Sequence, residues 1–516
     1  MESHQNILLI LKTERLWANT RPRRYIKEKN AFGNSVVEVE TAVPVFIGYT
    51  EKALNDTEDL TGKPWKITSM TEFIQYFGGM HIPKYTIAFK TGSEEPAPSA
   101  KSFSVKASSG SEFSIAVEND YTLYLHMLFF FANGGGPCYI VSVGNYKTEL
   151  KAADFETAFA PLEKEAEPTM IVIPEAVNLA DADCYALQQK MVEHCNKMMS
   201  RISILDVFID KYPANPAVKV DYVDKFRNGF STNFPSYAAA YYPYLNTSVL
   251  SDTDITDSMI VLKDNVTDFI MHIGWEEAMI ASFTAAFLKE GSSGEMTKDI
   301  NQALLQNSVV YQQLIKAVKY DLNLLSPSAA IAGVYCSVDN SRGVWKAPAN
   351  VTINSVVKPS ATINDYEQEE LNVPITGKAV NAIRTFPGEG IKVWGARTLD
   401  GNSQDWRYVN VRRTMIYLEQ SVKNAARAYV FEPNDAGTWI NMKCMIDNFL
   451  RSVWKRGGLA GATPEDALRG ARGSGRHDDS RRHSGRHHAH HGASGSQPPG
   501  RVYRNHLPAA DAEELK

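Results

Sequence analysis

The sequence lacks several features that mark secreted, membrane and metal-binding proteins. It has five cysteines in 516 residues, and no two of them form a Cys-x-x-Cys pair, so neither a disulfide framework nor a zinc site is indicated. No apolar run reaches the eighteen or so residues of a membrane-spanning helix. The apolar run at 7–11 is too short for a signal peptide core, and no typical cleavage site follows it. We therefore expect assembly in the cytoplasm, no signal peptide and no direct membrane insertion.

The chain has only a small excess of charge of one sign, and it lacks the common catalytic motifs. The formal net charge is only −5, which gives no reason to expect a nucleic-acid partner. The glycines at 134–136 follow an expected helix and precede an expected strand, the reverse of the order in a phosphate-binding P-loop. No Gly-x-Ser-x-Gly or His-Glu-x-x-His motif occurs. We expect no catalytic, cofactor-binding or metal-binding residue and no enzyme activity, although an α/β enzyme without a recognisable motif remains an alternative.

Hydrophobic patterning predicts a mixed α/β (α+β) chain of several domains. Strands and helices alternate over 135–245, which predicts an α/β layer. Three alternating segments within 84–118 predict a β-rich insertion at the surface. Further along, helices are expected at 299–320, 411–430 and 438–455, and the last two are long.

The segment 342–350 stands out as a candidate junction. An apolar run at 329–338 precedes it and predicts a buried strand, which a turn at 339–341 would end. Gly343 gives backbone freedom, Trp345 offers a large surface to bury, and Pro348 stops any helix. We interpret it as the place where two halves of a structural subunit meet, with an ordinary loop as the alternative.

Near the N-terminus the pattern predicts extended structure. Residues 25–29 suit an extended arm. At 35–40, Val37 and Val39 alternate with Glu38 and Glu40, which predicts a half-buried strand.

Several motifs in one order resemble the contractile tail sheath proteins of phages and phage-tail-like particles. They are AVPVFIGY at 42–49, NGGGPCY at 133–139, SPSAAIAGVY at 326–335, RGVWKAPAN at 342–350, WGART at 394–398, WRYVNVRR at 406–413, and FEPN at 431–434 with Trp439. The resemblance covers about residues 25–466. It is strongest to the sheaths of extracellular contractile injection systems and pyocins.

The resemblance implies a mechanical role. Sheath subunits of this family stack as hexameric rings around an inner tube, and contraction drives the tube through a target envelope. The implied partners are neighbouring sheath subunits, the inner tube protein, and baseplate and terminator or cap proteins, with no cofactor. A non-contracting baseplate or terminator component is the structural alternative. The implied location is a phage tail or a released tail-like particle.

The resemblance also suggests interface residues. Terminal arms in this family add strands to the sheets of neighbouring subunits, so Tyr25, Ile26, Val37 and Val39 are candidate arm residues. The basic residues of the first long helix are candidate contacts to the inner tube, unless they form an ordinary solvated face; they are Arg412, Arg413, Lys423 and Arg427.

The implied domain plan has two sheath domains and two aberrant ends. The N-terminal and central domain covers 25–337, and the C-terminal sheath domain, with the two long helices, covers 338–466. Residues 1–24 and 467–516 do not match the family. From residue 468 onwards the tail carries seven of the twelve histidines, which could mean a metal- or nucleic-acid-binding tail or plain disorder.

A third explanation for the ends is a shifted reading frame. Read one nucleotide later, codons for 496–503 can spell Ser-Arg-Pro-Ala-Glu-Phe-Ile, a phrase of the family's C-terminal strand. A similar shift near Arg24 can give Tyr-Lys-Thr-Pro-Gly-Val before Tyr25. We therefore expect the chain as written to form a soluble core without a stable sheath. Resequencing the gene tests this hypothesis, and an intact frame whose tail peptide is detected by mass spectrometry would contradict it.

Overall fold

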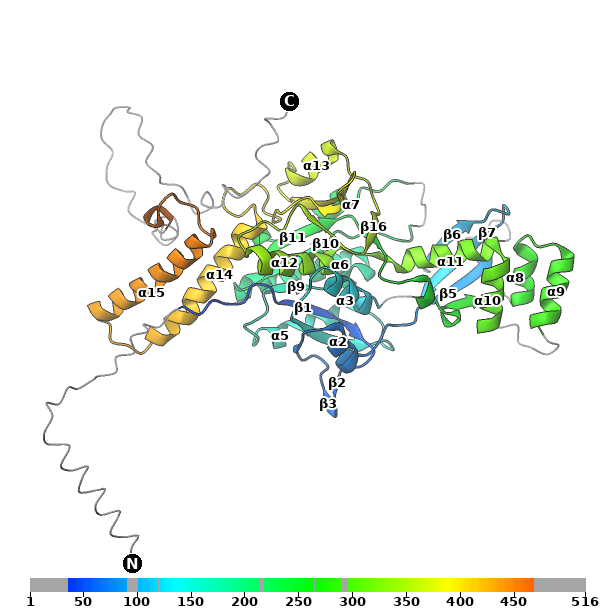
Figure 1. The fold of residues 1–516 in the computed structure, drawn as a ribbon, viewed down its shortest axis with the longest axis horizontal. Coiled ribbons are helices and arrows are strands. Elements are labelled where there is room, and N and C mark those ends of the chain that lie inside the picture. Colours follow the sequence, from blue (N-terminus) through cyan, green and yellow to red (C-terminus); the bar gives the residue numbers. More distant parts are fainter. Residues whose placement is uncertain are drawn as a thin grey trace, which may run out of the picture.

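The computed structural model describes residues 36–90, 101–118, 121–213, 218–263, 265–288 and 296–467. Figure 1 shows a central α/β layer, a lobe of strands and short helices on one side, and a pair of long helices on the other. Residues 1–24 and 468–516 lie outside the described residues, as do the candidate arm residues Tyr25 and Ile26.

The central layer is a sheet of nine strands in the order β15-β18-β17-β11-β10-β9-β1-β8-β4. Its six middle strands run parallel, whereas β4, β15 and β18 are antiparallel to their neighbours. Their bounds are β1 Pro44–Thr50, β4 Trp65–Ile67, β8 Cys138–Asn145, β9 Met170–Val172, β10 Ile202–Asp206, β11 Ala238–Tyr242, β15 Val351–Thr352, β17 Val380–Phe386 and β18 Gly390–Val393. The parallel centre explains the continuous apolar runs, because such strands are buried on both faces.

Helices cover both faces of this sheet. Successive residues of β1 point to opposite sides: Phe46 joins one buried cluster, while Val45 and Ile47 join the other. The first side is covered by α2 (Met70–Phe77), α3 (Leu123–Ala132) and α12 (Ser328–Arg342). The second is covered by α4 (Ala152–Glu156), α5 (Phe159–Leu162), α6 (Asp181–Met198) and α7 (Tyr222–Gly229). The α/β layer expected from the sequence is therefore present.

Helix α12 corrects the strand predicted for 329–338. Nearly every residue in it is buried, so its sequence shows no amphipathic period, and an apolar run of this kind is easily mistaken for a core strand. Gly333 is the point of closest approach to α3, since a Cβ there would lie 2.6 Å from the carbonyl oxygen of Phe130. Close helix packing therefore selects glycine at this position.

The side lobe is built on a second sheet in the order β13-β5-β7-β6. The three strands predicted within 84–118 are found as β5 (Lys84–Phe89), β6 (Ser102–Lys106) and β7 (Glu112–Glu118). A fourth strand, β13 (Ile260–Leu262), pairs in parallel with β5, so the sheet is completed by a segment far along the chain. The helices beside it are α8 (Val266–His272), α9 (Glu277–Phe287), α10 (Lys298–Asn307) and α11 (Val309–Leu322).

The helix predicted at 299–320 is two helices, α10 and α11. Ser308 lies between them in an extended conformation, and its hydroxyl accepts a hydrogen bond from the Tyr311 amide at 3.1 Å. A serine N-cap of this kind starts a new helix inside an otherwise continuous apolar pattern.

Smaller elements complete the fold. Strands β12 (Leu245–Thr247), β14 (Leu324–Leu325) and β16 (Val356–Pro359) form a three-stranded sheet, and β2 (Leu54–Asn55) pairs with β3 (Glu58–Asp59). Helix α13 (Asp365–Asn372) precedes β17. None of the described helices is long and apolar enough to cross a membrane.

The two long helices predicted near the C-terminus are present as α14 (Val409–Ala426) and α15 (Ala436–Lys455). They form a helical hairpin that projects from the α/β layer, with its turn at the far end (Figure 1). A third, smaller buried cluster joins them, and it includes Val411, Leu418, Phe449 and Val453.

Candidate subunit interface

A buried ion pair ties the helical hairpin to the α/β layer. The Arg413 guanidinium on α14 donates two hydrogen bonds to the Asp339 carboxylate on α12, at 2.9 and 2.6 Å. It also donates to the carbonyl oxygen of Thr41, at 2.9 Å. Three segments that are distant in sequence therefore meet at one side chain.

The environment of Arg413 keeps it charged. Burial alone would lower its pKa, but the attraction and hydrogen bonds of Asp339 outweigh this and raise the pKa above its usual value. The guanidinium also lies over the Tyr335 ring, 4.7 Å from its centroid, a favourable cation–π arrangement. A charge held in this way costs much free energy if its partner is removed.

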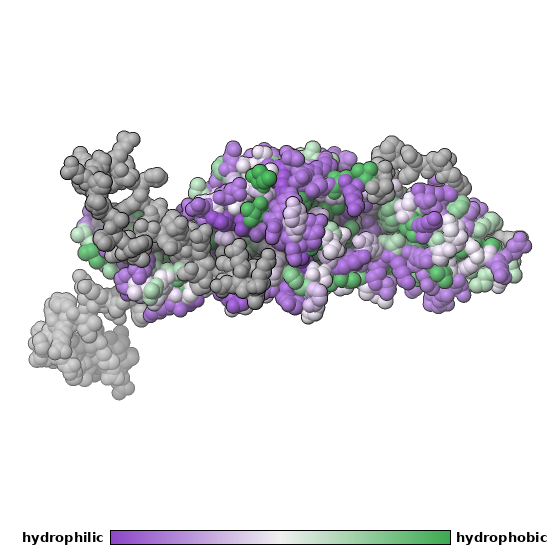
Figure 2. Space-filling model, turned by 90° about the horizontal axis from the view of Figure 1, so that it is seen from above, coloured by the Kyte–Doolittle hydropathy of each residue, from purple (hydrophilic) through white to green (hydrophobic). Residues whose placement is uncertain are grey.

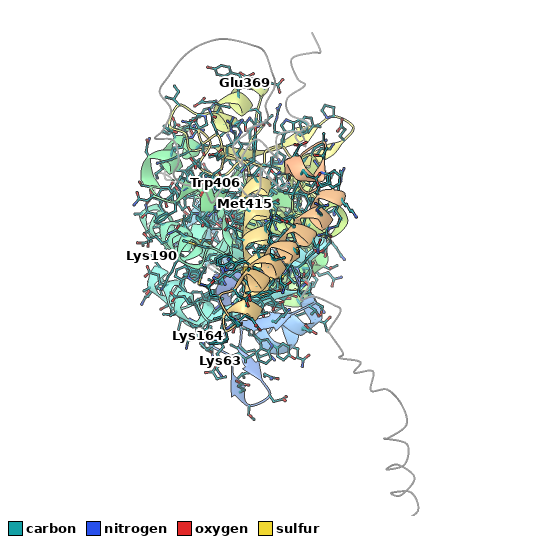
Figure 3. The ribbon with its side chains drawn as sticks, turned by 90° about the vertical axis from the view of Figure 1, so that its left-hand side faces the viewer. Lys63, Lys164, Lys190, Glu369, Trp406 and Met415 are labelled. Atoms are coloured by element: carbon teal, nitrogen blue, oxygen red, sulfur yellow. The ribbon has the colours of Figure 1, made fainter. Side chains whose placement is uncertain are left out.

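Arg412 is also buried, and it stacks between two aromatic rings. Its guanidinium carbon lies 3.8 Å from the centroid of Tyr237 and 4.6 Å from that of Trp406. Figure 3 shows Met415 on α14 and Trp406 near the start of that helix.

The burial of Arg412 and Arg413 corrects their placement among surface contacts to an inner tube. Residues 409–414 are all buried, because this half of α14 lies against the layer. The helical spacing of the apolar residues places both arginines at polar positions. Packing of α14 against the layer nevertheless buries them. Asp339, an acid within an otherwise apolar run, was the sequence signal for a buried cationic partner.

The predicted half-buried strand at 35–40 is not found in the described residues 36–40, which form no regular secondary structure and pair with no described strand. This segment runs along the hairpin instead. The Val39 amide donates to the Ser421 hydroxyl at 3.2 Å, and Glu38 accepts two hydrogen bonds from Arg456, at 2.9 and 2.6 Å. Val39 packs on the hairpin, whereas Val37 is 78% exposed.

The segment 342–350 lies where the layer and the hairpin meet. Gly343 ends α12 with φ of +90°, a conformation that favours glycine. The side chains of Val344 and Trp345 pack with the hairpin cluster, and Asn410 of α14 donates to the Trp345 carbonyl at 2.9 Å. These contacts agree with interpreting the segment as a junction.

A groove of about 440 Å³ runs between the hairpin and the layer. Lys423 and Arg427, the other two basic candidates, line its α14 side and are exposed. Glu40 and Glu167 contribute to its lining from the layer side. Glu167 is already engaged, since it pairs with Lys66 and accepts from the Tyr139 hydroxyl. The groove thus combines charged side chains with a largely apolar lining.

The far end of the hairpin exposes large apolar side chains. Phe431, in the turn, is 99% exposed, and the others are Val430, Trp439 and Ile440. Sequence reasoning noted Phe431 and Trp439 only as parts of motifs, not as surface residues. A gathering of exposed apolar residues marks an interaction surface.

Within the described ranges, no group of three or more His, Cys, Asp or Glu residues is arranged to hold a metal ion. Four cysteines are buried there, and Cys444 on α15 is exposed.

Comparison with known proteins identifies a family model and a relative that are similar to parts of this chain. Residues 402–479, which include α14 and α15, match the family model described as the phage tail sheath C-terminal domain. This match continues past residue 466, the expected limit of the C-terminal domain. A tail sheath protein of Vibrio phage KVP40 is 26% identical over 140 residues, which is 27% of this chain. The match spans about a fifth of that relative, 21% of its length.

Two solved structures share the fold. One is the baseplate of the anti-feeding prophage in the contracted state, with a TM-score of 0.52 and 22% identity, covering 83% of this chain and 82% of that one. The other is the six-fold symmetrised baseplate of the same particle, with a TM-score of 0.50 and 23% identity, covering 87% of each chain. The domain match, the curated relative and the shared fold confirm the resemblance of this chain to the contractile tail sheath proteins.

Proposed function

We propose that the chain is a structural subunit of a contractile tail sheath. It would assemble as hexameric rings around an inner tube and shorten to drive that tube through a target envelope. The observation that carries this proposal is the tail sheath C-terminal domain match over the helical hairpin, in a chain with the sheath fold. The six-fold symmetry of one baseplate that shares the fold is consistent with rings of six.

The proposed partners are other copies of this chain, the inner tube protein, and the baseplate and cap proteins. In this proposal the chain does not act as an enzyme, because the contacts of the hairpin serve association. The energy for contraction would reside in the extended arrangement of the subunits.

Residues 25–40 are the proposed N-terminal arm. In a single chain, residues 36–40 form no regular secondary structure and pair with no described strand, so their backbone is available to add to a neighbour's sheet. Exposed Val37 is free to pack on that neighbour, while Val39 anchors the arm to its own hairpin.

Contact with the inner tube is proposed for Lys423 and Arg427 alone among the four basic candidates. Both are exposed at the groove, whereas Arg412 and Arg413 hold the subunit together. Reversal of both exposed charges should weaken attachment to the tube and leave the subunit folded.

The structural alternative is a non-contracting component of the baseplate. The two solved structures described above come from baseplate assemblies of the anti-feeding prophage. The length of the assembled particle separates the two roles, because a sheath extends along the tube and a baseplate component forms one layer at its end.

The test compares two proteins by electron microscopy in the presence of the inner tube protein. One is the chain as printed, and the other has both ends rewritten in the shifted frame. We expect cylinders from the rewritten chain only. Cylinders from the printed chain would show that its own ends suffice, and monomers from both would overturn the sheath proposal.

A further inference from the structure

The end of the helical hairpin presents one well-defined surface, here called the tip. It consists of Val430, Phe431, Trp439 and Ile440, with Arg427 and Lys443 exposed beside them. Two acids are also at the turn: Glu432 is exposed, and the Asp435 carboxylate caps α15 by accepting from the Thr438 amide at 2.7 Å. Aromatic side chains flanked by cations are typical of interface centres, where tryptophan and arginine concentrate binding energy.

A second exposed apolar surface, which carries acids and no basic residue, lies on α13 and is here called the shoulder. Tyr366, Glu369 and Val373 are spaced three and four residues apart and therefore share one face of the helix. All three are exposed, as is Ile375 just beyond the helix, whose side chain is fully accessible. The helix contains four acids and no basic residue.

Two of the shoulder's acids are already engaged with the layer. Asp365 pairs with Arg384 at 2.8 Å, and Glu370 lies 3.6 Å from Arg227. Glu367 accepts from the Asn364 amide within the helix cap. The Glu369 carboxylate has no hydrogen-bond or ion-pair partner among the described residues, so it remains available for a cation from another molecule.

The tip and the shoulder are far apart on one molecule. Figure 1 places α13 at the top of the α/β layer and the turn between α14 and α15 at the lower left. Figure 3, turned by 90°, again places Glu369 at the top, away from that turn. The two surfaces therefore cannot cover one another within a chain. Figure 2 shows a mainly hydrophilic upper surface with few hydrophobic patches.

We infer that the tip of one copy docks on the shoulder of a second copy. Apolar side chains then meet apolar side chains, while Lys443 of the tip faces the Glu369 carboxylate of the shoulder. Because the two surfaces differ, the contact is heterologous, and such a contact generates a ring or a helix. The inference rests on the proposed sheath function and names one contact through which the subunits associate.

The exposed thiol of Cys444 gives a direct test in the full chain. Cys444 lies four residues after Ile440, on the same face of α15, and the other described cysteines are buried. With Glu369→Cys, mild oxidation should link the Cys444 of one copy to residue 369 of the next. Each molecule then carries one donor and one acceptor, so non-reducing gels should show a ladder of dimers, trimers and longer chains.

Three controls identify the contact. Lys63→Cys adds a thiol at an exposed position on the same scaffold and should give no ladder above the background of the unchanged chain. Cys444→Ser in the Glu369→Cys background should abolish the ladder. Dimers alone from the unchanged chain would indicate tip-to-tip pairing through Cys444 and would overturn the inference.

Substitution at the shoulder provides a second measure. Ile375→Asp places a charge where apolar side chains should meet, and its full exposure means that folding is unaffected. We expect sedimentation to report self-association weakened about tenfold, the factor that corresponds to 1.4 kcal/mol. Two results together would overturn this contact and leave the sheath proposal intact. Cylinders would form without any disulfide ladder, and Ile375→Asp would not change their formation. Monomers under all conditions, also from the chain with rewritten ends, would overturn both.

Discussion

The α/β layer and the helical hairpin are stabilised in different ways. The layer buries both faces of a largely parallel sheet under helices, and its two clusters contain most of the buried apolar residues. The hairpin has a small cluster, and beyond it the hairpin exposes Phe431, Trp439 and Ile440. The difference indicates that the layer folds around its own core, whereas part of the hairpin's apolar surface suits a partner.

The connection between these regions combines apolar packing with a polar centre. Arg413, Asp339 and the Thr41 carbonyl form its buried centre, and Glu38 with Arg456 forms an exposed part. If this comparison holds, substitutions at the connection should release the hairpin, while substitutions in the layer should unfold the whole protein.

The largest effect is expected at the buried ion pair. Asp339→Ala leaves the Arg413 charge buried without its counter-ion, which should lower the free energy of unfolding by about 3–5 kcal/mol. Urea unfolding measures the loss, and limited proteolysis shows whether the hairpin is released first. The control is the double variant Asp339→Leu with Arg413→Met, which removes both charges and should lose less. An equal or greater loss in the double variant would contradict this account.

A pH-dependent effect is expected in the layer at Asp206. Burial raises the pKa of its carboxyl to about 6, even though Ser328 donates hydrogen bonds to it. Between about pH 4 and pH 6 the folded state therefore holds a proton that the unfolded state has released. The free energy of unfolding should fall by up to about 3 kcal/mol as the pH rises through this window. Asp206→Asn should flatten that part of the stability–pH curve, and a slope that persists in it would count against Asp206 as the source.

A smaller effect is expected where α12 crosses α3. Gly333→Val forces a side chain against the Phe130 carbonyl and should destabilise the protein by about 1–3 kcal/mol. The matched control is Gly136→Val, because a Cβ at Gly136 meets nothing within 4 Å. Thermal unfolding of the two variants compares them directly, and similar melting temperatures would argue against the tight crossing.

The smallest effect is expected at the exposed ion pair of the connection. Burial tends to raise the pKa of Glu38, but hydrogen bonds from Tyr417 and Arg456 outweigh this and lower it. Its stabilisation is therefore present above the pKa of the unfolded state and is lost as the pH falls, the opposite of Asp206. Glu38→Gln should lower the free energy of unfolding by less than about 1 kcal/mol. Added salt should reduce this difference, because salt screens the ion pair of the unchanged chain and the variant has no such pair. A loss in the free energy of unfolding well above about 1 kcal/mol would contradict the description of Glu38 and Arg456 as a weak surface ion pair.

Sequence patterns predicted the elements whose burial is one-sided or whose ends are well marked. Strands β5 and β7 alternate clearly, and α14 and α15 repeat apolar residues at helical spacing. Helix α12 was missed because it is buried on all sides, where periodicity carries no information. The break at Ser308 was missed because one capping serine interrupts no apolar pattern.

The candidate interface was predicted less completely. The basic residues of α14 were found, but the division into buried Arg412 and Arg413 and exposed Lys423 and Arg427 depends on how far α14 lies against the layer. The unpaired extension at 36–40 also depends on context, because a strand needs a neighbour to bond with. The interface roles of Val37, Val39, Lys423 and Arg427 remain predictions.

The position of β1 has a mechanical consequence. The extension at 36–43 leads directly into β1, which lies between the parallel strands β8 and β9. Tension applied to that extension acts along β1, so it shears many backbone hydrogen bonds at once instead of peeling them one by one. A tether anchored in this way can carry load without unravelling the subunit to which it is attached.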